Sequence, residues 1–238
     1  MTRSISDLLR ERIAVVEERL QAACSRAGRD RREITLVAVT KTISAAIAAL
    51  LPELGLLHLG ENRPQELWRK AATVRKTVHW HLVGHLQRNK IERTLPLVHL
   101  IHSVDSLRLL EALEKEAARQ GRPVPVLLEV NASREPQKHG FGPDELLQFL
   151  PPIAALQHVQ VEGLMTMAAL AEDPERGRPT FALARRLRGR LAEELGPPHT
   201  MRHLSMGMSN DFEIAIEEGA TLVRIGTALF EGISQDET

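Results

Sequence analysis

Short apolar runs recur along the chain, and polar segments separate them. Several runs are continuous rather than alternating, which is typical of strands buried on both faces of a parallel sheet. Eight runs stand in order: Ile34–Val39, Leu56–Leu59, Val78–Val83, Leu97–Ile101, Val124–Val130, Val159–Gly163, Met201–Leu204 and Thr221–Ile225. Segments between them, such as Ser106–Arg119 and Pro174–Leu195, are amphipathic and long enough for crossover helices. The repeated alternation predicts an α/β fold, a single closed (β/α)8 TIM-type barrel rather than an open doubly wound sheet.

The segment before the first run has helical periodicity. Apolar residues from Ile5 to Ala23 recur at helical spacing, Ser4 and Asp7 offer an N-terminal cap, and Gly28 can end the helix. We therefore predict an extra helix over about 5–27, packed against a barrel over about 34–233, in one domain of residues 1–238.

Composition indicates which classes of partner and which cellular compartment suit the chain. Of 238 residues, 43% are hydrophobic, which is enough for one sizeable core. Lys plus Arg equals Asp plus Glu at 31 each, so the chain lacks the basic balance of a nucleic-acid-binding protein. Cys24 is the only cysteine, which suits a reducing compartment. With no apolar signal region and no membrane-length apolar stretch, the sequence predicts a soluble cytoplasmic protein.

The C-terminal ends of barrel strands are where active sites form. Lys41 directly follows the first predicted strand and therefore lies at the barrel mouth. Burial there is expected to lower its pKa, the condition for a neutral amine that forms a Schiff base. By position alone, an ordinary solvated lysine at a strand end is the alternative.

Two loops after the seventh and eighth predicted strands carry the features of a phosphate site. The first contains Ser205 and Gly207, and the second contains Arg224, Gly226 and Thr227. Glycines let a backbone approach a ligand, and hydroxyls and helix N-termini supply donors to a phosphate. These loops are the recurrent phosphate site of the barrel architecture. A phosphorylated carbonyl compound bound as an imine accounts for both loops and the lysine.

Other strand ends supply groups that suit a pyridine ring and its 3′-oxygen. They are Asn62, His85, Asn131 and Met165. His79, His81 and His85 also allow a metal site, but no carboxylate follows at useful spacing. We therefore interpret these histidines as packing and hydrogen-bonding residues, with no metal.

Seven ordered motifs give the sequence a family resemblance over nearly its whole length. The matching segments are Val37–Lys41, Leu59–Asn62, Trp80–Lys90, His102–Ser106, Gly163–Met167, Leu204–Ser209 and Val223–Ala228. With them the chain resembles the YggS/PROSC family of pyridoxal phosphate (PLP) homeostasis proteins. The resemblance implies a fold similar to the N-terminal barrel of alanine racemase. It also implies PLP as the cofactor, with the imine on Lys41 and the phosphate near Ser205, Arg224, Gly226 and Thr227.

The resemblance implies a regulator or carrier of PLP in vitamin B6 and amino-acid homeostasis, with PLP-dependent apo-enzymes as recipients. Three positions depart from the family pattern at the rim: Arg63, His139 and Glu231. The alternative is a PLP-dependent amino-acid racemase of low activity. Alanine racemase uses a tyrosine from a C-terminal domain of the partner subunit as its second base, and this sequence has no tyrosine. Without that dimerisation domain we expect a monomer. A weaker third hypothesis is a Schiff-base aldolase that acts on a phosphorylated sugar.

Overall fold

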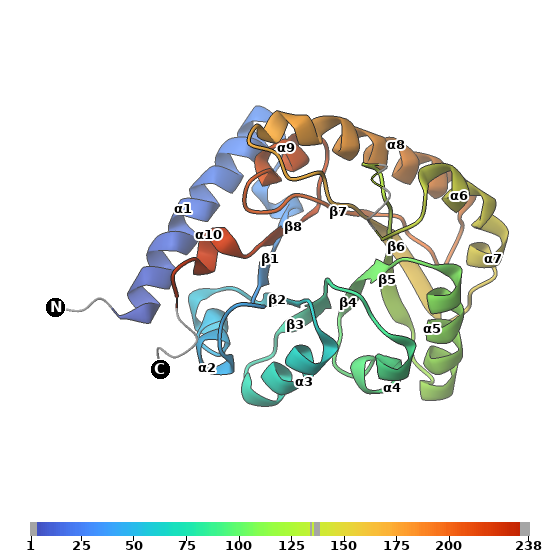
Figure 1. The fold of residues 1–238 in the computed structure, drawn as a ribbon, viewed down its shortest axis with the longest axis horizontal. Coiled ribbons are helices and arrows are strands. Elements are labelled where there is room, and N and C mark those ends of the chain that lie inside the picture. Colours follow the sequence, from blue (N-terminus) through green and yellow to red (C-terminus); the bar gives the residue numbers. More distant parts are fainter. Residues whose placement is uncertain (1–3, 134, 136–138, 234–238) are drawn as a thin grey trace.

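Eight parallel strands close into a barrel in the order β1 to β8, as the sequence predicts (Figure 1). The computed structural model describes residues 4–133, 135 and 139–233. The strands are β1 (Thr35–Val39), β2 (His58–Glu61), β3 (His79–Leu82), β4 (Leu100–Val104), β5 (Val124–Glu129), β6 (Val159–Met165), β7 (His203–Ser205) and β8 (Leu222–Ile225). β1 pairs with β8 over four residues and so closes the barrel.

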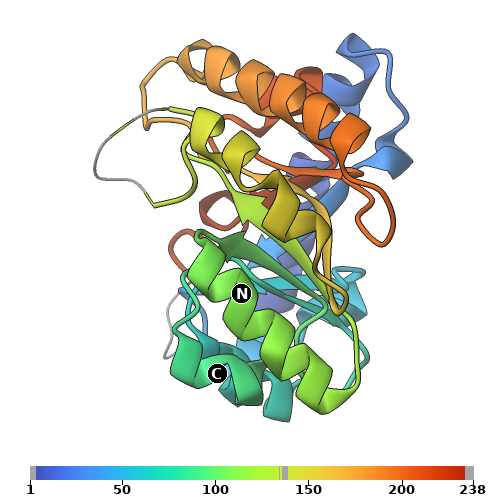
Figure 2. The same ribbon diagram turned by 90° about the vertical axis from the view of Figure 1, so that its right-hand side faces the viewer.

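Helices cover the outside of the strands. The α-helices are α1 (Ile5–Arg26), α2 (Ala45–Ala48), α3 (Pro64–Thr73), α4 (Ile91–Thr94), α5 (Leu107–Gln120), α6 (Pro143–Gln148), α7 (Leu150–Ala154), α8 (Arg178–Glu194), α9 (Phe212–Glu217) and α10 (Thr227–Phe230). Short 3-10 segments occupy Arg31–Glu33, Leu51–Leu54, Arg88–Lys90 and Pro174–Gly177. Helices α5, α6 and α7 lie on the side away from α1 (Figure 2). Among the described residues, no helix is both long and apolar enough to cross a membrane.

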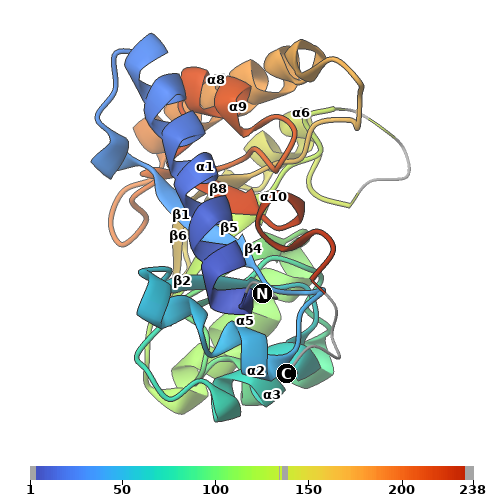
Figure 3. The ribbon, with the colours of Figure 1, turned by 90° about the vertical axis from the view of Figure 1, so that its left-hand side faces the viewer.

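The N-terminal helix α1 begins and ends where the sequence predicts. The Ser4 hydroxyl caps it by accepting a hydrogen bond from the Asp7 N–H, and the chain leaves the helix through Gly28 in the left-handed region, at φ 64°. The helix crosses the outside of α9 and α10 (Figure 3). An ion pair of 2.8 Å between Arg19 and Glu213 joins α1 to α9.

Two separate apolar clusters support the fold. The larger one fills the layer between the strands and the helices. The smaller one lies inside the barrel and has five buried members: Val37, Leu100, Leu127, Met165 and Leu222. Barrel interiors are usually filled by layers of branched apolar residues. Here histidine, serine, arginine and glutamate side chains occupy much of the remaining interior, so the inside of this barrel is unusually polar.

Several strands continue beyond the apolar runs that predicted them. The fourth was predicted at Leu97–Ile101 but runs over Leu100–Val104, and the second and seventh also shift toward their C-terminal ends. The prediction ended the fourth strand too early because His102 and Ser103 are polar. In the closed barrel both side chains are buried and hydrogen-bonded, so burying them leaves neither side chain without a hydrogen-bonding partner.

Candidate functional site

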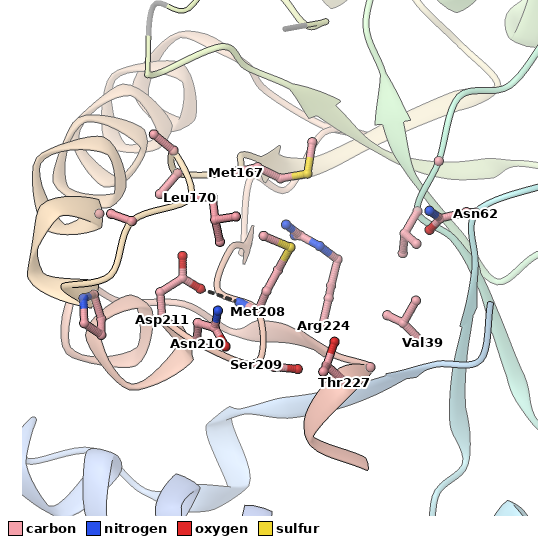
Figure 4. A pocket seen from close by; sticks show the side chains of 18 of the residues that line it. Val39, Asn62, Met167, Leu170, Met208, Ser209, Asn210, Asp211, Arg224 and Thr227 are labelled. Carbon is pink, nitrogen blue, oxygen red and sulfur yellow. Dashed lines mark hydrogen bonds between the residues drawn. The ribbon is translucent and has the colours of Figure 1, made fainter. Parts of the chain in front are cut away.

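A cavity of about 410 Å3 opens at the C-terminal ends of the strands. Its size lies in the range of small-molecule sites. Six of the residues predicted from sequence line it: Lys41, Asn62, His85, Arg224, Gly226 and Thr227. Figure 4 shows side chains from the ends of β1, β2 and β8 and from the loop after β7 pointing into this space.

Lys41 stands in the turn that follows β1 and contributes to the cavity lining. Its side chain is exposed, so the expectation that the barrel mouth buries it is wrong. The chain turns outward directly after the buried residue Thr40, and this carries Lys41 from the strand to the rim. The lysine is therefore open to a ligand that arrives from solvent.

A buried ion pair fixes the backbone at the base of Lys41. Lys70 of α3 donates to a Glu61 carboxylate oxygen and to the Thr40 carbonyl, both at 2.6 Å. The Thr40 hydroxyl donates to the same carboxylate oxygen at 2.6 Å. Both charged side chains are only 1% exposed. This cluster holds the peptide group that leads into Lys41 and the end of β2 that leads into Asn62.

The loops after β7 and β8 join at one side of the cavity. The Ser209 hydroxyl accepts a hydrogen bond of 3.1 Å from the Ala228 N–H in the first turn of α10. Asp211 accepts one of 2.6 Å from the Met208 N–H, which fixes the shape of the first loop. Burial raises the pKa of Asp211. The contact between Ser209 and Ala228 places hydroxyls and backbone N–H groups of both loops next to each other, as an anion site requires.

Arg224 extends along the inside of the barrel rather than toward the loops. Its guanidinium donates to the Ser205 hydroxyl at 2.6 Å and to the Thr166 carbonyl at 3.0 Å. In Figure 4 the group lies on the side of Met167, away from Thr227. Burial lowers the pKa of Arg224 to about 10, and the nearby carboxylates Asp211 and Glu129 partly offset this effect. The arginine is therefore a cation at the floor of the cavity.

A histidine and a carboxylate stand at the other side of the mouth. His85 Nδ1 is 3.0 Å from an Asp105 oxygen, and the His85 ring stacks on His139 at 5.8 Å between centroids. His139 and Glu129 also line the cavity. Burial, and after it the charge of Asp105, raises the pKa of Glu129.

Four predicted residues do not line the cavity. Asn131 donates to the Glu135 carbonyl at 2.7 Å, and Met165 packs in the apolar cluster inside the barrel. Ser205 lies buried below the cavity, beside Arg224. Gly207 has a φ of 92°, and a Cβ there would stand 2.6 Å from the Ala215 Cβ, so its backbone is required by packing against α9.

Sequence reasoning missed several lining residues, notably Glu129 and the segment Ala168–Ala171. Glu129 belongs to the fifth predicted strand, and a carboxylate near the end of a buried strand is the signal that could have identified it. Of the family departures, Arg63 precedes α3 and lines an adjoining groove, whereas Glu231 follows α10 outside the cavity lining.

The histidines of β2, β3 and β4 make hydrogen bonds and ring contacts inside the barrel. His81 Nε2 is 2.9 Å from His58 Nδ1, and His81 Nδ1 is 2.8 Å from His102 Nε2. The rings of His58 and His79 stack at 4.7 Å. Over the described parts of the chain, no group of three or more His, Cys, Asp or Glu is arranged to hold a metal ion.

The chain is similar to known proteins over most of its length. The family described as "Alanine racemase, N-terminal domain" matches residues 14–233. A pyridoxal phosphate homeostasis protein of Aquifex aeolicus is 42% identical over 92% of this chain and 96% of its own length. The human protein of the same name is 35% identical over 92% of this chain and 84% of its own.

The chain belongs to the pyridoxal phosphate homeostasis protein family.

Two solved structures separate what the family shares from what the fold shares. PipY of Synechococcus elongatus, solved with PLP bound, is 35% identical, with a TM-score of 0.80 over 93% of this chain and 99% of that one. An alanine racemase of Clostridium difficile is 18% identical, with a TM-score of 0.75 over 98% of this chain and 58% of that one. At that identity the racemase shares the fold alone. This member of the pyridoxal phosphate homeostasis protein family thus shares its barrel fold with alanine racemase. The family resemblance inferred from the seven motifs is confirmed.

Proposed function

We propose that this chain binds PLP in the cavity at the barrel mouth, as a Schiff base on Lys41, and serves PLP homeostasis. The observation that carries the proposal is that one cavity is lined by Lys41 and by both loops predicted to bind phosphate. Relatives named for PLP homeostasis, and the PLP-bound PipY structure at 35% identity, support the choice of ligand. We further propose PLP-dependent apo-enzymes as recipients.

The residues of the cavity fit the cofactor. PLP presents an aldehyde, a pyridine ring and a phosphate dianion. The Lys41 amine, once it has lost its proton to solvent, can condense with the aldehyde carbon to form a C=N bond and release one water molecule. Thr227, Gly226 and Ser209 lie together where hydroxyl and backbone donors suit the phosphate. When bound, PLP supplies an electron sink to an amine attached to it.

The chain's own groups favour binding over catalysis. The resemblance implies that racemisation needs a second base opposite the lysine, and the sequence has no tyrosine to act as one. His85 is the best placed alternative, but its ring is paired with Asp105 and stacked on His139 at an exposed rim. A mouth that exposes Lys41 also lets a cofactor leave, as a carrier requires.

Borohydride reduction followed by peptide mass mapping tests the attachment. Protein incubated with PLP is expected to show an imine absorption band that borohydride bleaches, with the pyridoxyl group on the peptide containing Lys41. A pyridoxyl group on Lys90 or Lys138 instead contradicts the assignment; Lys138 lies outside the described residues. A chain that binds a phosphorylated sugar in preference to PLP shows no such band and supports the aldolase hypothesis.

To test the non-catalytic role, PLP-loaded protein is incubated with L-alanine and other amino acids in deuterated water. Turnover for any amino acid in the common enzymatic range of about 1–10³ s⁻¹ contradicts a carrier. Loss of such turnover in His85→Ala then identifies the second base.

A further inference from the structure

Three histidines form a hydrogen-bonded column inside the barrel that ends at the arginine of the cavity floor. From Arg224 the contacts run to Ser205 Oγ at 2.6 Å, from Ser205 to His102 Nδ1 at 2.8 Å, from His102 Nε2 to His81 Nδ1 at 2.8 Å, and from His81 Nε2 to His58 Nδ1 at 2.9 Å. His102 and His81 are 0% and 1% exposed. His58, at the start of β2, is half-buried and forms the outer end.

The arginine imposes one direction on all of these bonds. A guanidinium can only donate, so Ser205 accepts from Arg224. The buried Ser205 hydroxyl then has His102 Nδ1 as the acceptor for its own proton. His102 is left with its proton on Nε2 and donates to His81, which in turn donates from Nε2 to His58. The geometry thus assigns the Nε2–H tautomer to His58, His81 and His102.

We propose that His58, His81 and His102 are positioning residues that orient the Ser205 hydroxyl and, through it, the Arg224 guanidinium at the floor of the PLP cavity. This inference rests on the proposed function, because it assigns a role toward the cofactor that the cavity would hold. The column gives Ser205 a fixed acceptor, so the hydroxyl presents its lone pairs to Arg224. The guanidinium is thereby held by Ser205 on one side and by the Thr166 carbonyl on the other.

The order of the bonds depends on the column being neutral. A proton added at His58 Nδ1 removes the acceptor of His81, whose proton must then move to Nδ1. The same exchange follows at His102, which would then donate from Nδ1 to the Ser205 oxygen, so the hydroxyl keeps its proton but must turn it away from His102. One proton at the outer end therefore reverses every bond up to the residue that holds Arg224.

Burial keeps the column neutral at ordinary pH. Burial, and then the neighbours His79 and His99, lowers the pKa of His58 to about 4. Burial also holds the pKa values of His81 and His102 well below the usual range. The titratable and charged groups that act on the column from other positions are His79, His99, His203 and Arg224. Glu162 and Arg202 act on His99 and His203 beside it. Glu162 alone favours protonation, and it does so at His99 and His203 rather than within the column.

In the part of the chain that the structure describes, two neighbouring histidines pack against the column without a hydrogen bond to it. His79 and His99 lie in the same group of rings, in contact with His58, and within the described residues their side chains make no hydrogen bond to the column. They are matched controls: the same residue type at the same end of the barrel, outside the column.

The first experiment measures the tautomers without cofactor. Long-range ¹H–¹⁵N NMR spectra of ¹⁵N-histidine-labelled protein are expected to show Nε2–H in His58, His81 and His102. Ser205→Ala, which removes the donor to His102, is expected to shift the ring nitrogens of all three and to leave those of His79 and His99 in place. A proton on His102 Nδ1, or a shift in the rings of His79 and His99 alone, contradicts the positioning role of the column.

The second experiment measures the cofactor. His102→Phe is expected to weaken PLP binding roughly tenfold and to move the absorption maximum of bound PLP, because Ser205 loses its acceptor and Arg224 its orientation. His79→Phe and His99→Phe are expected to stay within about twofold of wild type, with an unmoved spectrum. If His102→Phe does not fold, His58→Phe replaces it, with a smaller loss of affinity and shifted His102 nitrogens expected.

The outcomes separate the two proposals. Wild-type protein that forms no adduct at Lys41 overturns the proposed function, whatever the tautomers. A second outcome is that wild-type protein binds PLP and that folded His102→Phe and His58→Phe match it in affinity and spectrum. This outcome overturns the positioning role of the column and leaves the proposed function standing. Equal losses in His79→Phe and His58→Phe also overturn the positioning role, because they would make the effect one of packing.

Discussion

Lys41 and Lys70 lie at the same end of β1 and β2, yet their environments are opposite. Lys41 is exposed at the rim of the cavity. Lys70 is 1% exposed and donates to Glu61 and to the Thr40 carbonyl, one residue before Lys41. A buried ammonium persists only when it is paired and hydrogen-bonded, so Lys70 has a structural role and is not available to react. The comparison shows that access to the cavity, rather than burial, distinguishes the lysine proposed to bind PLP.

The sharpest test of this comparison is to remove the exposed lysine. Lys41→Ala is expected to abolish the covalent PLP adduct while the free energy of unfolding changes by no more than about 0.5 kcal/mol, as for most surface substitutions. Mass spectrometry after borohydride reduction and urea unfolding measure the two effects. A full adduct in Lys41→Ala, or its transfer to Lys70, would reverse the roles assigned to the two lysines.

Removing the buried lysine should do the opposite. Lys70→Met leaves the Glu61 carboxylate buried without its cation, which is expected to cost about 3–5 kcal/mol of stability. Urea unfolding measures this loss. Lys76→Met is the control, because Lys76 pairs with Glu53 at side-chain exposures of 53% and 62%, and exposed pairs contribute about 0–1 kcal/mol. The double variant Lys70→Met/Glu61→Met should recover most of the loss, and failure to recover it would contradict the buried-charge explanation.

Affinity for PLP should depend on the loops as well as on Lys41. Thr227→Val removes a hydroxyl donor to the phosphate and is expected to weaken equilibrium binding roughly tenfold, since hydrogen bonds to charged groups contribute about 1.5–3 kcal/mol. Thr73→Val on the exposed end of α3 is the control and should bind as wild type does. Pyridoxal, which lacks the phosphate, should bind poorly. Equal affinity for PLP and pyridoxal would exclude a phosphate site here.

The last prediction concerns His58, which is half-buried and neutral at ordinary pH. The pKa of His58 is lowered to about 4 in the folded protein, from an ordinary value of 6.5. The unfolded chain therefore binds a proton at higher pH than the folded chain does, so stability should fall as pH decreases from about 6.5 toward 4. Urea unfolding at several pH values measures this slope, which should be shallower in His58→Phe. Identical slopes in the two proteins would show that His58 does not carry the linkage.

The place of Lys41 along the chain could be predicted from the sequence better than its environment could. The position of Lys41 after the first strand follows from the apolar run before it, because a buried strand must end where the barrel opens. Its exposure did not follow, since it depends on the direction of the turn after Thr40. The predicted end of the fourth strand was wrong for a related reason: the partners of His102 lie on β3 and β7, far away in sequence.

The sequence by itself predicted the barrel: continuous apolar runs indicate parallel strands buried on both faces, and eight of them separated by helical segments favour a closed barrel over an open doubly wound sheet. It also determined the family and the lysine and loops proposed to hold PLP. Only the tertiary structure decided which polar residues could be buried. In the sequence, Glu61, Lys70, His81 and His102 interrupt the apolar pattern. The fold brings each of them a hydrogen-bonding partner, and a paired polar group costs little to bury.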